Sequence, residues 1–195
     1  GGRRVRRHFG EDSPRASVKG APQHTILGLG SNLGDRADII AQAIELLGKL
    51  PETRVLAISE AVDSDPVGYA DQPNFLNLCL AITCRFNPDE LLVKTLEIER
   101  ELGRERTAHR NGPRTLDIDL LFYEGGAWDS PTVTLPHPRW SSRGFVILPL
   151  RNLLQVPALA KLPVWGSLAA EVRSLSLGGQ GLRAWQGPTP WSKTP

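Results

Sequence analysis

Two aspartates and a cluster of arginines stand close together near the middle of the sequence. The aspartates are Asp117 and Asp119, and the arginines before them are Arg104, Arg106, Arg110 and Arg114. In an extended strand the two carboxylates point to the same side, about 7 Å apart at ~3.3 Å rise per residue. A buried carboxylate without a partner costs several kcal/mol, so we expect cations beside this pair.

These residue types permit two interpretations. In the first, the arginines pair with the aspartates and the cluster is purely structural. In the second, the aspartates bind a hard divalent metal while the arginines bind anionic oxygens, which is the arrangement that a polyphosphate with Mg²⁺ requires. We favour the second, because Mg²⁺ takes few ligands from the protein and the rest from phosphate and water.

The pattern of apolar residues predicts the elements that position this cluster. Leu116, Ile118, Leu120 and Phe122 recur with period two and predict a strand with all four on one apolar face. Further strands are expected over residues 25–30, 55–62 and 75–84. Cysteines 79 and 84 should face opposite sides of the third of these and so cannot form a disulfide with each other.

Two helices are expected between these strands. Asp35 is a suitable N-cap for the first, and Asn87-Pro88-Asp89-Glu90 is typical of a helix start, with Gly103 at the end of the second helix. The order strand, helix, strand, strand, helix, strand predicts an α+β fold of the ferredoxin-like split βαβ type, an antiparallel sheet with both helices on one face. Beyond it we expect a strand at 133–135 and a short helix over 141–154, interrupted near Pro149.

Composition divides the 195 residues into three parts. We expect a disordered basic leader at 1–23, one domain at 24–176, and a flexible Gly- and Pro-rich tail at 177–195. The leader holds six of the 23 Lys and Arg and two of the 21 Asp and Glu, so the remainder carries a net charge near −2. That balance argues against a general nucleic-acid surface. No apolar run is long enough to span a membrane, and the unpaired cysteines suit a reducing cytoplasm.

Three weaker patterns leave their alternatives open. The glycines at 28, 30 and 34 do not match a phosphate-binding loop, and a tight turn explains them better. His137 between two prolines is either an ordinary loop histidine or a donor to phosphate. Phe75 and Asn77 either line the sheet or supply a stacking ring and an amide that read a flat heterocycle.

Taken together, several stretches resemble one family, 6-hydroxymethyl-7,8-dihydropterin pyrophosphokinase of folate biosynthesis. The resemblance covers residues 24–170 and rests on segments in the same order along the chain. They are Gly30-Ser-Asn-Leu-Gly-Asp-Arg36, Asp71-Gln-Pro-Asn-Phe-Leu-Asn77, Gly103-Arg104-x-Arg106, Arg110-Asn-Gly-Pro-Arg-Thr-Leu-Asp-Ile-Asp119, Pro136-His137 and Arg143-Gly-Phe-Val-Ile-Leu-Pro-Leu150.

The resemblance implies an enzyme that transfers the terminal pyrophosphate of ATP to the pterin hydroxymethyl group and releases AMP. It implies that Asp117 and Asp119 bind two Mg²⁺ ions. It further implies three groups of site residues. Catalytic positions are Arg104, Arg114, His137 and Arg143; ATP-binding positions add Arg106, Leu120 and Thr134; pterin-binding positions are Ser64, Asp65, Val67, Phe75, Asn77 and Phe145.

The sequence departs from other family members at a few positions. Asn111, Thr132 and Leu96 stand where some members have an aromatic residue, an arginine and a glutamine, which predicts an altered nucleotide affinity. The resemblance implies a monomer that acts on small molecules, with no nucleic-acid or membrane partner. The alternative is a non-catalytic RNA- or nucleotide-binding module, because RNA-recognition domains share the same strand order.

Overall fold

The computed structural model describes residues 20–103 and 115–193. Its main sheet has six strands, and every pairing in it is antiparallel, which confirms the predicted α+β class. The strand order is β5-β1-β4-β3-β8, and β2 also pairs with β4. The strands are β1 (Gln23–Ser31), β2 (Arg54–Ile58), β3 (Val62–Ser64), β4 (Phe75–Cys84), β5 (Asp117–Tyr123) and β8 (Leu182–Ala184). The single strand expected over 55–62 is thus two short strands.

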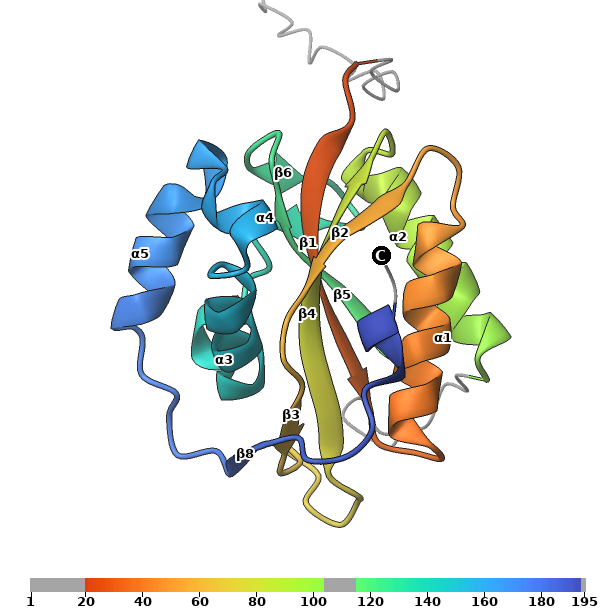
Figure 1. Ribbon diagram of the computed structural model, residues 1–195, viewed down its shortest axis with the longest axis vertical. Coiled ribbons are helices and arrows are strands. Elements are labelled where there is room, and N and C mark those ends of the chain that lie inside the picture. The colour runs from red at the N-terminus through yellow and green to blue at the C-terminus, as the bar shows by residue number, and fades with distance from the viewer. Residues whose placement is uncertain (1–19, 104–114, 194–195) are drawn as a thin grey trace, which may run out of the picture.

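One face of the sheet is covered by α1 (Arg36–Gly48) and α2 (Pro88–Glu101), as predicted (Figure 1). The predicted helix starts are confirmed. The Asp35 side chain accepts the backbone N–H of Asp38, and Asn87 and Glu90 form a reciprocal capping box. The core beneath the helices holds one full face of β4, namely Leu76, Leu78, Leu80 and Ile82, together with apolar residues of both helices.

The other face is covered by α3 (Gly144–Leu153), α4 (Pro157–Ala160) and α5 (Gly166–Ser174), which lie across the sheet from α1 and α2 in Figure 1. Small residues of β4, Cys79 and Ala81, let these helices pack close to the sheet. Cys84 lies in the opposite cluster, and both cysteines are free thiols. The expected interruption at Pro149 is wrong, because α3 continues through it to Leu153. A proline removes one helical hydrogen bond, and the tight burial of α3 offsets this loss.

A β-bulge in β5 corrects one part of the predicted apolar face. Ile26 pairs with Phe122, whereas the next residue of β1, Leu27, pairs with Leu120, so one extra residue of β5 is accommodated. Leu120 therefore stays in the core under α1 and α2. Phe122 instead packs in the second core, with its ring edge-on to Trp140 at a centroid distance of 5.0 Å.

The C-terminal residues, expected to be a flexible tail, are instead packed over their described part. β8 adds to the sheet next to β3, and the 3₁₀ turn Pro190–Lys193 brings Trp191 to 4% exposure in the core beside α1. The large apolar area of the indole and the free edge of β3 supply partners that the composition alone does not reveal. A separate two-stranded ribbon pairs β6 (Trp128–Asp129) with β7 (Thr134–Leu135); β7 lies within the strand expected over 133–135, and β6 was not expected.

The remaining predictions concern the basic leader and membrane-spanning segments. Most of the leader, residues 1–19, lies outside the described residues, whereas β1 already begins at Gln23. None of the helices in the described ranges is long and apolar enough to cross a membrane.

Candidate active site

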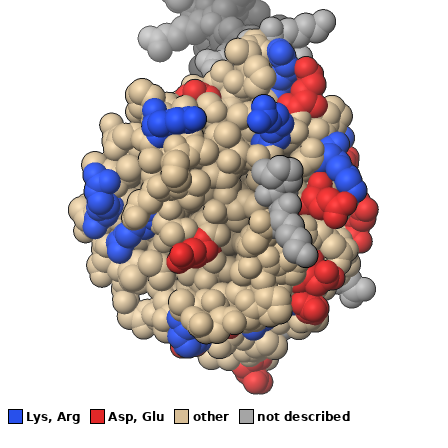
Figure 2. All heavy atoms as spheres, in the orientation of Figure 1, with Lys and Arg blue, Asp and Glu red and all other residues tan. Residues whose placement is uncertain are grey.

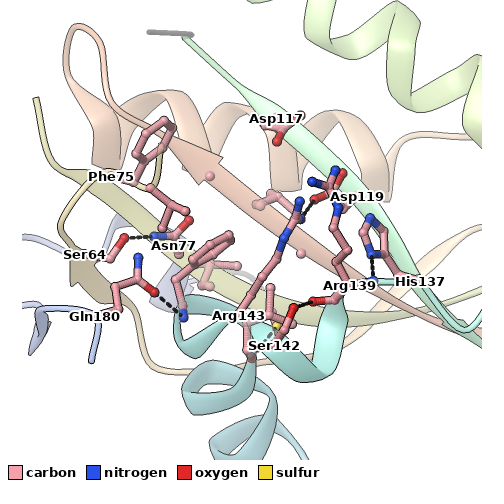
Figure 3. Close-up of a pocket in the computed structure, with 18 of the residues that line it drawn as sticks. Ser64, Phe75, Asn77, Asp117, Asp119, His137, Arg139, Ser142, Arg143 and Gln180 are labelled. Carbon is pink, nitrogen blue, oxygen red and sulfur yellow. Dashed lines mark hydrogen bonds and ion pairs between the residues drawn. The ribbon is translucent and has the colours of Figure 1, made fainter. Parts of the chain in front are cut away.

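A cavity of about 440 Å³ opens on the face of the sheet that α3 only partly covers (Figure 3). Its floor is formed by β1 and β4, one side by the start of β5, and the other by the end of β3 and the loop after it. The N-terminal turn of α3 and Gln180 complete the wall. Of the predicted site residues it is lined by Ser64, Asp65, Val67, Phe75, Asn77, Asp117, Asp119, His137, Arg143 and Phe145.

Two glycines of β1 create the hollow between the two halves of this cavity. Gly28 pairs with Asp119 on one side and Cys79 on the other, and Gly30 likewise pairs with Asp117 and Asn77. Neighbouring strands place paired residues on the same face, so the central strand carries no side chain exactly between the aspartates and β4. The tight-turn interpretation of these two glycines is therefore wrong. Only Gly34, with φ +68°, lies in the turn that leads to α1.

The carboxylates of Asp117 and Asp119 share one face of β5 and both line the cavity, as predicted. The strand is held at this point by Glu99 of α2, which is 2% exposed and whose Oε1 accepts the backbone N–H of Ile118 at 2.7 Å. On the cavity side, Arg143 Nη1 lies 3.5 Å from Asp119 Oδ2. The Arg143 guanidinium thus lies beside the two aspartates, at the N-terminus of α3.

The oxygen-only donor set at this point fits a hard divalent cation. Within residues 20–103 and 115–193 there is no group of three or more metal-ligating side chains. Two partly exposed carboxylates suit Mg²⁺, which retains water and takes substrate phosphate oxygens as its other ligands. The nearest thiol does not compete, because burial, assisted by the charge of Asp119, raises the pKa of Cys79 and keeps it protonated.

His137 faces the same end of the cavity and is held in one tautomer. Burial, followed by the charges of Arg143 and Arg139, lowers its pKa, and the opposing effect of Asp117 is smaller. The ring is therefore neutral at pH 7. Its Nδ1 accepts the backbone N–H of Arg139 at 3.1 Å, so the proton lies on Nε2, and this N–H can donate to an anionic oxygen.

The opposite end of the cavity combines two aromatic rings with a fixed amide. Phe75 of β4 and Phe145 of α3 both line the cavity, and the Arg143 guanidinium carbon lies 5.6 Å from the centroid of the Phe145 ring, where the aromatic and charged parts meet. The Asn77 Nδ2 donates to Ser64 Oγ at 2.7 Å, which fixes the direction of the amide and of its oxygen (Figure 3). A flat ring with a hydrogen-bonding edge matches such a site.

Of the predicted site residues that the structure describes, two do not line the cavity. Leu120 is buried in the core on the other face of the sheet, and Thr134 is exposed on β7, where its hydroxyl lies 3.3 Å from Asp129 Oδ1. Arg104, Arg106 and Arg114 lie outside the described residues, as does Asn111. Thr132, where some family members have arginine, donates instead to Asp89 Oδ1 at 2.6 Å.

The comparison with family models decides the assignment. The model for 7,8-dihydro-6-hydroxymethylpterin-pyrophosphokinase (HPPK) matches residues 26–155, which is most of the described core. The chain belongs to this family. The HPPK match begins in β1 and ends just after α3, so it includes every predicted cavity residue from Ser64 to Phe145.

Individual HPPK relatives agree with this assignment. The chain is 38% identical to the 2-amino-4-hydroxy-6-hydroxymethyldihydropteridine pyrophosphokinase of Bacillus subtilis, over 82% of this chain and 89% of the relative. It is 40% identical to the protein of the same name from Pseudomonas aeruginosa, over 72% of this chain and 88% of the relative.

Solved structures support the fold at much lower identity. Two triple mutants of Plasmodium falciparum HPPK-DHPS superpose with TM-scores of 0.55 and 0.54, both at 14% identity, over 80% and 70% of this chain. The chain spans only 45% and 40% of those two proteins, so the likeness concerns the fold of one part of them.

Among the hydrogen-bonding side chains that line the cavity, the sequence reasoning missed those of Arg139, Ser142 and Gln180. Arg139 and Ser142 lie between His137 and Arg143 in the sequence. Both neighbours were predicted site residues, so the position of Arg139 between them could have indicated it. Gln180 gave no such signal. It lies 25 residues beyond the end of the HPPK match, in the segment expected to be a flexible tail.

Proposed function

We propose that this protein transfers the terminal pyrophosphate of ATP to the hydroxymethyl group of 6-hydroxymethyl-7,8-dihydropterin, a step of folate biosynthesis. The pterin hydroxyl oxygen attacks the β-phosphorus and gives up its proton to solvent, the bond from that phosphorus to the oxygen bridging the α-phosphorus breaks, and AMP leaves. The observation that carries the proposal is one cavity with two chemically different ends. One end has aromatic rings and an amide, and the other has carboxylates with a neutral histidine and an arginine.

The aromatic end is assigned to the pterin. Phe75 and Phe145 would stack on the two faces of the ring, and the Asn77 amide, held by Ser64, would read its edge. Val67, 55% exposed in the loop after β3, would cover the outer side. Asp65, predicted as a pterin-binding position, would form the wall of the slot, because its backbone N–H donates to Gly181 O and its carbonyl accepts from Gln180.

The polar end is assigned to the triphosphate. Asp117 and Asp119 would hold Mg²⁺, two ions by the family resemblance, and bound metal would neutralise charge on the transferring phosphates. His137 would donate its Nε2 proton to a phosphate oxygen, and Arg143, 3.5 Å from Asp119, would turn its guanidinium to the phosphates. Such fixed donors stabilise developing charge without reorganising during the reaction.

The remaining assignments rest on the resemblance alone. Arg104, Arg106 and Arg114 would bind the triphosphate, and Leu120 and Thr134 would lie along the ATP. The ferredoxin-like description of the fold is supported by the order β5-β1-β4-β3 and by both α1 and α2 covering one face. We assign the catalytic domain to residues 24–176, with the C-terminal segment packed on its β3 edge.

The RNA-binding alternative finds little support in the surface. In the face shown in Figure 2, basic side chains of the described residues are scattered among acidic ones, with no continuous basic area. RNA-recognition domains present aromatic residues within a basic surface, whereas this cavity presents two carboxylates.

The test measures AMP formed from ATP with and without the pterin and Mg²⁺. We expect AMP only when both are present, and Asp119→Asn to lower kcat by about 100-fold or more, since its carboxylate would act directly on bound charge. Asp38→Asn on α1, an exposed aspartate outside the cavity, is the matched control and should stay within about twofold of wild type. Absence of pterin-dependent AMP in the wild type would refute the function, and a fully active Asp119→Asn would refute the metal assignment.

A further inference from the structure

The C-terminal segment 178–186 is fastened to the rim of the pterin end of the cavity. β8 pairs with β3 along the register Val62 with Ala184, Asp63 with Arg183 and Ser64 with Leu182. The backbone N–H of Asp65 then donates to Gly181 O at 2.9 Å, which carries the pairing past the end of β3. The segment therefore follows the strand whose last residue, Ser64, holds Asn77.

Gln180 connects two walls of the cavity through a single side-chain amide (Figure 3). Its Nε2 donates to the carbonyl of Asp65 at 2.9 Å, and its Oε1 accepts the backbone N–H of Phe145 at 3.2 Å. One wall is the loop after β3, and the other is the first turn of α3. The second contact also satisfies one of the N–H groups that a helix start leaves without an intrahelical partner.

The packing around this bridge leaves little freedom for either wall. A Cβ on Gly144, at the start of α3, would meet Leu182 at 3.0 Å and would press still closer on the backbone of Leu177. The side chain of Arg183 adds ion pairs to Asp63 at 2.8 Å and to Asp65 at 2.7 Å on the outer side. Thus the segment holds the loop from outside, while Gln180 alone reaches into the cavity from it.

We propose that Gln180 is a positioning residue that sets the separation between the loop at Asp65 and the ring of Phe145, and so the width of the pterin slot. The inference rests on the proposed function, because it assigns this end of the cavity to the pterin. It gives a role in substrate selection to a segment that lies beyond the matched family region. Gln180 would act on the affinity for the pterin and not on the reacting phosphates, which bind at the opposite end.

The experiment compares three variants of the full chain. Gln180→Leu keeps the size of the side chain and removes both hydrogen bonds; Gln180→Glu keeps an acceptor for Phe145 and removes the donor to Asp65. Gln186→Leu is the matched control, since Gln186 is exposed, lies outside the cavity and makes a long 3.5 Å contact with Ala184 O. For each, KM is measured for pterin and for ATP, together with kcat and the melting temperature.

We expect Gln180→Leu and Gln180→Glu to raise the KM for pterin by about 10-fold, the effect of losing one or two net hydrogen bonds. The KM for ATP and kcat should stay within about twofold. Direct binding of 6-hydroxymethyl-7,8-dihydropterin, followed by its fluorescence with α,β-methylene-ATP present to block bond cleavage, should weaken by the same factor. Gln186→Leu should match the wild type in every measurement.

Each other outcome overturns the inference. A wild-type KM for pterin in both Gln180 variants would show that the bridge does not set the slot. Equal losses in kcat and both KM values, with a lowered melting temperature, would show a merely structural role. If the wild-type protein forms no pterin-dependent AMP, the proposed function is wrong and the inference is wrong with it. If the wild type is active and both Gln180 variants keep its KM for pterin, the inference alone is refuted.

Discussion

Gly30→Ala should weaken pterin binding without disturbing the backbone. Gly30 lies inside β1 and is not one of the glycines with a positive φ, so alanine adds no backbone strain. An added Cβ would lie 2.9 Å from Asn77 Oδ1, whereas ordinary contact begins near 3.4 Å. The amide must therefore move by about 0.5 Å or rotate, which disrupts its 2.7 Å contact with Ser64.

The magnitude follows from these two costs. Losing the hydrogen bond between Asn77 and Ser64 costs about 0.5–1.5 kcal/mol, and a displaced rotamer costs about as much again. Together they amount to about 1–3 kcal/mol, or roughly a 5- to 140-fold rise in the KM for pterin at 1.4 kcal/mol per factor of ten. Steady-state kinetics with varied pterin at saturating ATP measure this rise.

Gly28→Ala is the matched control for this substitution. Gly28 lies two residues away on the same face and also lines the cavity, but a Cβ there would meet the flexible Leu121 side chain at 3.3 Å and no polar group. Its KM for pterin should change less than about threefold. In an Asn77→Ala background, Gly30→Ala should have almost no further effect, because the group that it displaces is gone. An undiminished effect in that background would mean that the new methyl group blocks the pterin itself, which would refute the reasoning.

Two further predictions concern stability. Burial and two arginines lower the pKa of His137, so the folded protein binds this proton less readily than the unfolded chain. The free energy of unfolding should therefore fall as the pH drops below about 6.5, the ordinary pKa of histidine. Urea titrations from pH 7.5 to 5.5 should show a smaller fall for His137→Gln. An identical pH dependence in both proteins would contradict this. Trp191→Ala should lower the free energy of unfolding by about 3–5 kcal/mol because the indole is 4% exposed in the core, whereas Ser192→Ala beside it should change it by less than about 0.5 kcal/mol. Unchanged unfolding of Trp191→Ala in urea would mean that the C-terminal turn contributes no packing.

Local signals were sufficient for much of the fold. The caps at Asp35 and Asn87 depend on residues within one helical turn, and both are found as predicted. The two faces of β4 follow from strict alternation, which places Leu78 under the helices and Cys79 on the other side. The bulge that moves Phe122 to the second core depends on how β5 pairs with β1, and no neighbouring residue in the sequence specifies that register.

The same distinction applies to the site. Asp117 and Asp119 are two residues apart, so their common face is a local property, and Phe75 and Asn77 share a face for the same reason. That these two pairs border one cavity is a property of the sheet, in which β1 stands between β4 and β5. The C-terminal contacts of Gln180 join residues more than 30 positions apart, and a Gly- and Pro-rich composition carries no information about them.

The carboxylate pair and the two glycines of β1 therefore shape the same part of the cavity. Gly28 and Gly30 pair with the two aspartates on one side and with Cys79 and Asn77 on the other, so a groove without side chains crosses the sheet from the carboxylates, which we assign to Mg²⁺, to the amide, which we assign to the pterin. In-line transfer needs the attacking hydroxyl and the β-phosphorus to approach along a single path. Side chains larger than that of alanine at these two positions would fill the groove along that path, so the strand has glycines on this face and leucines on its opposite face.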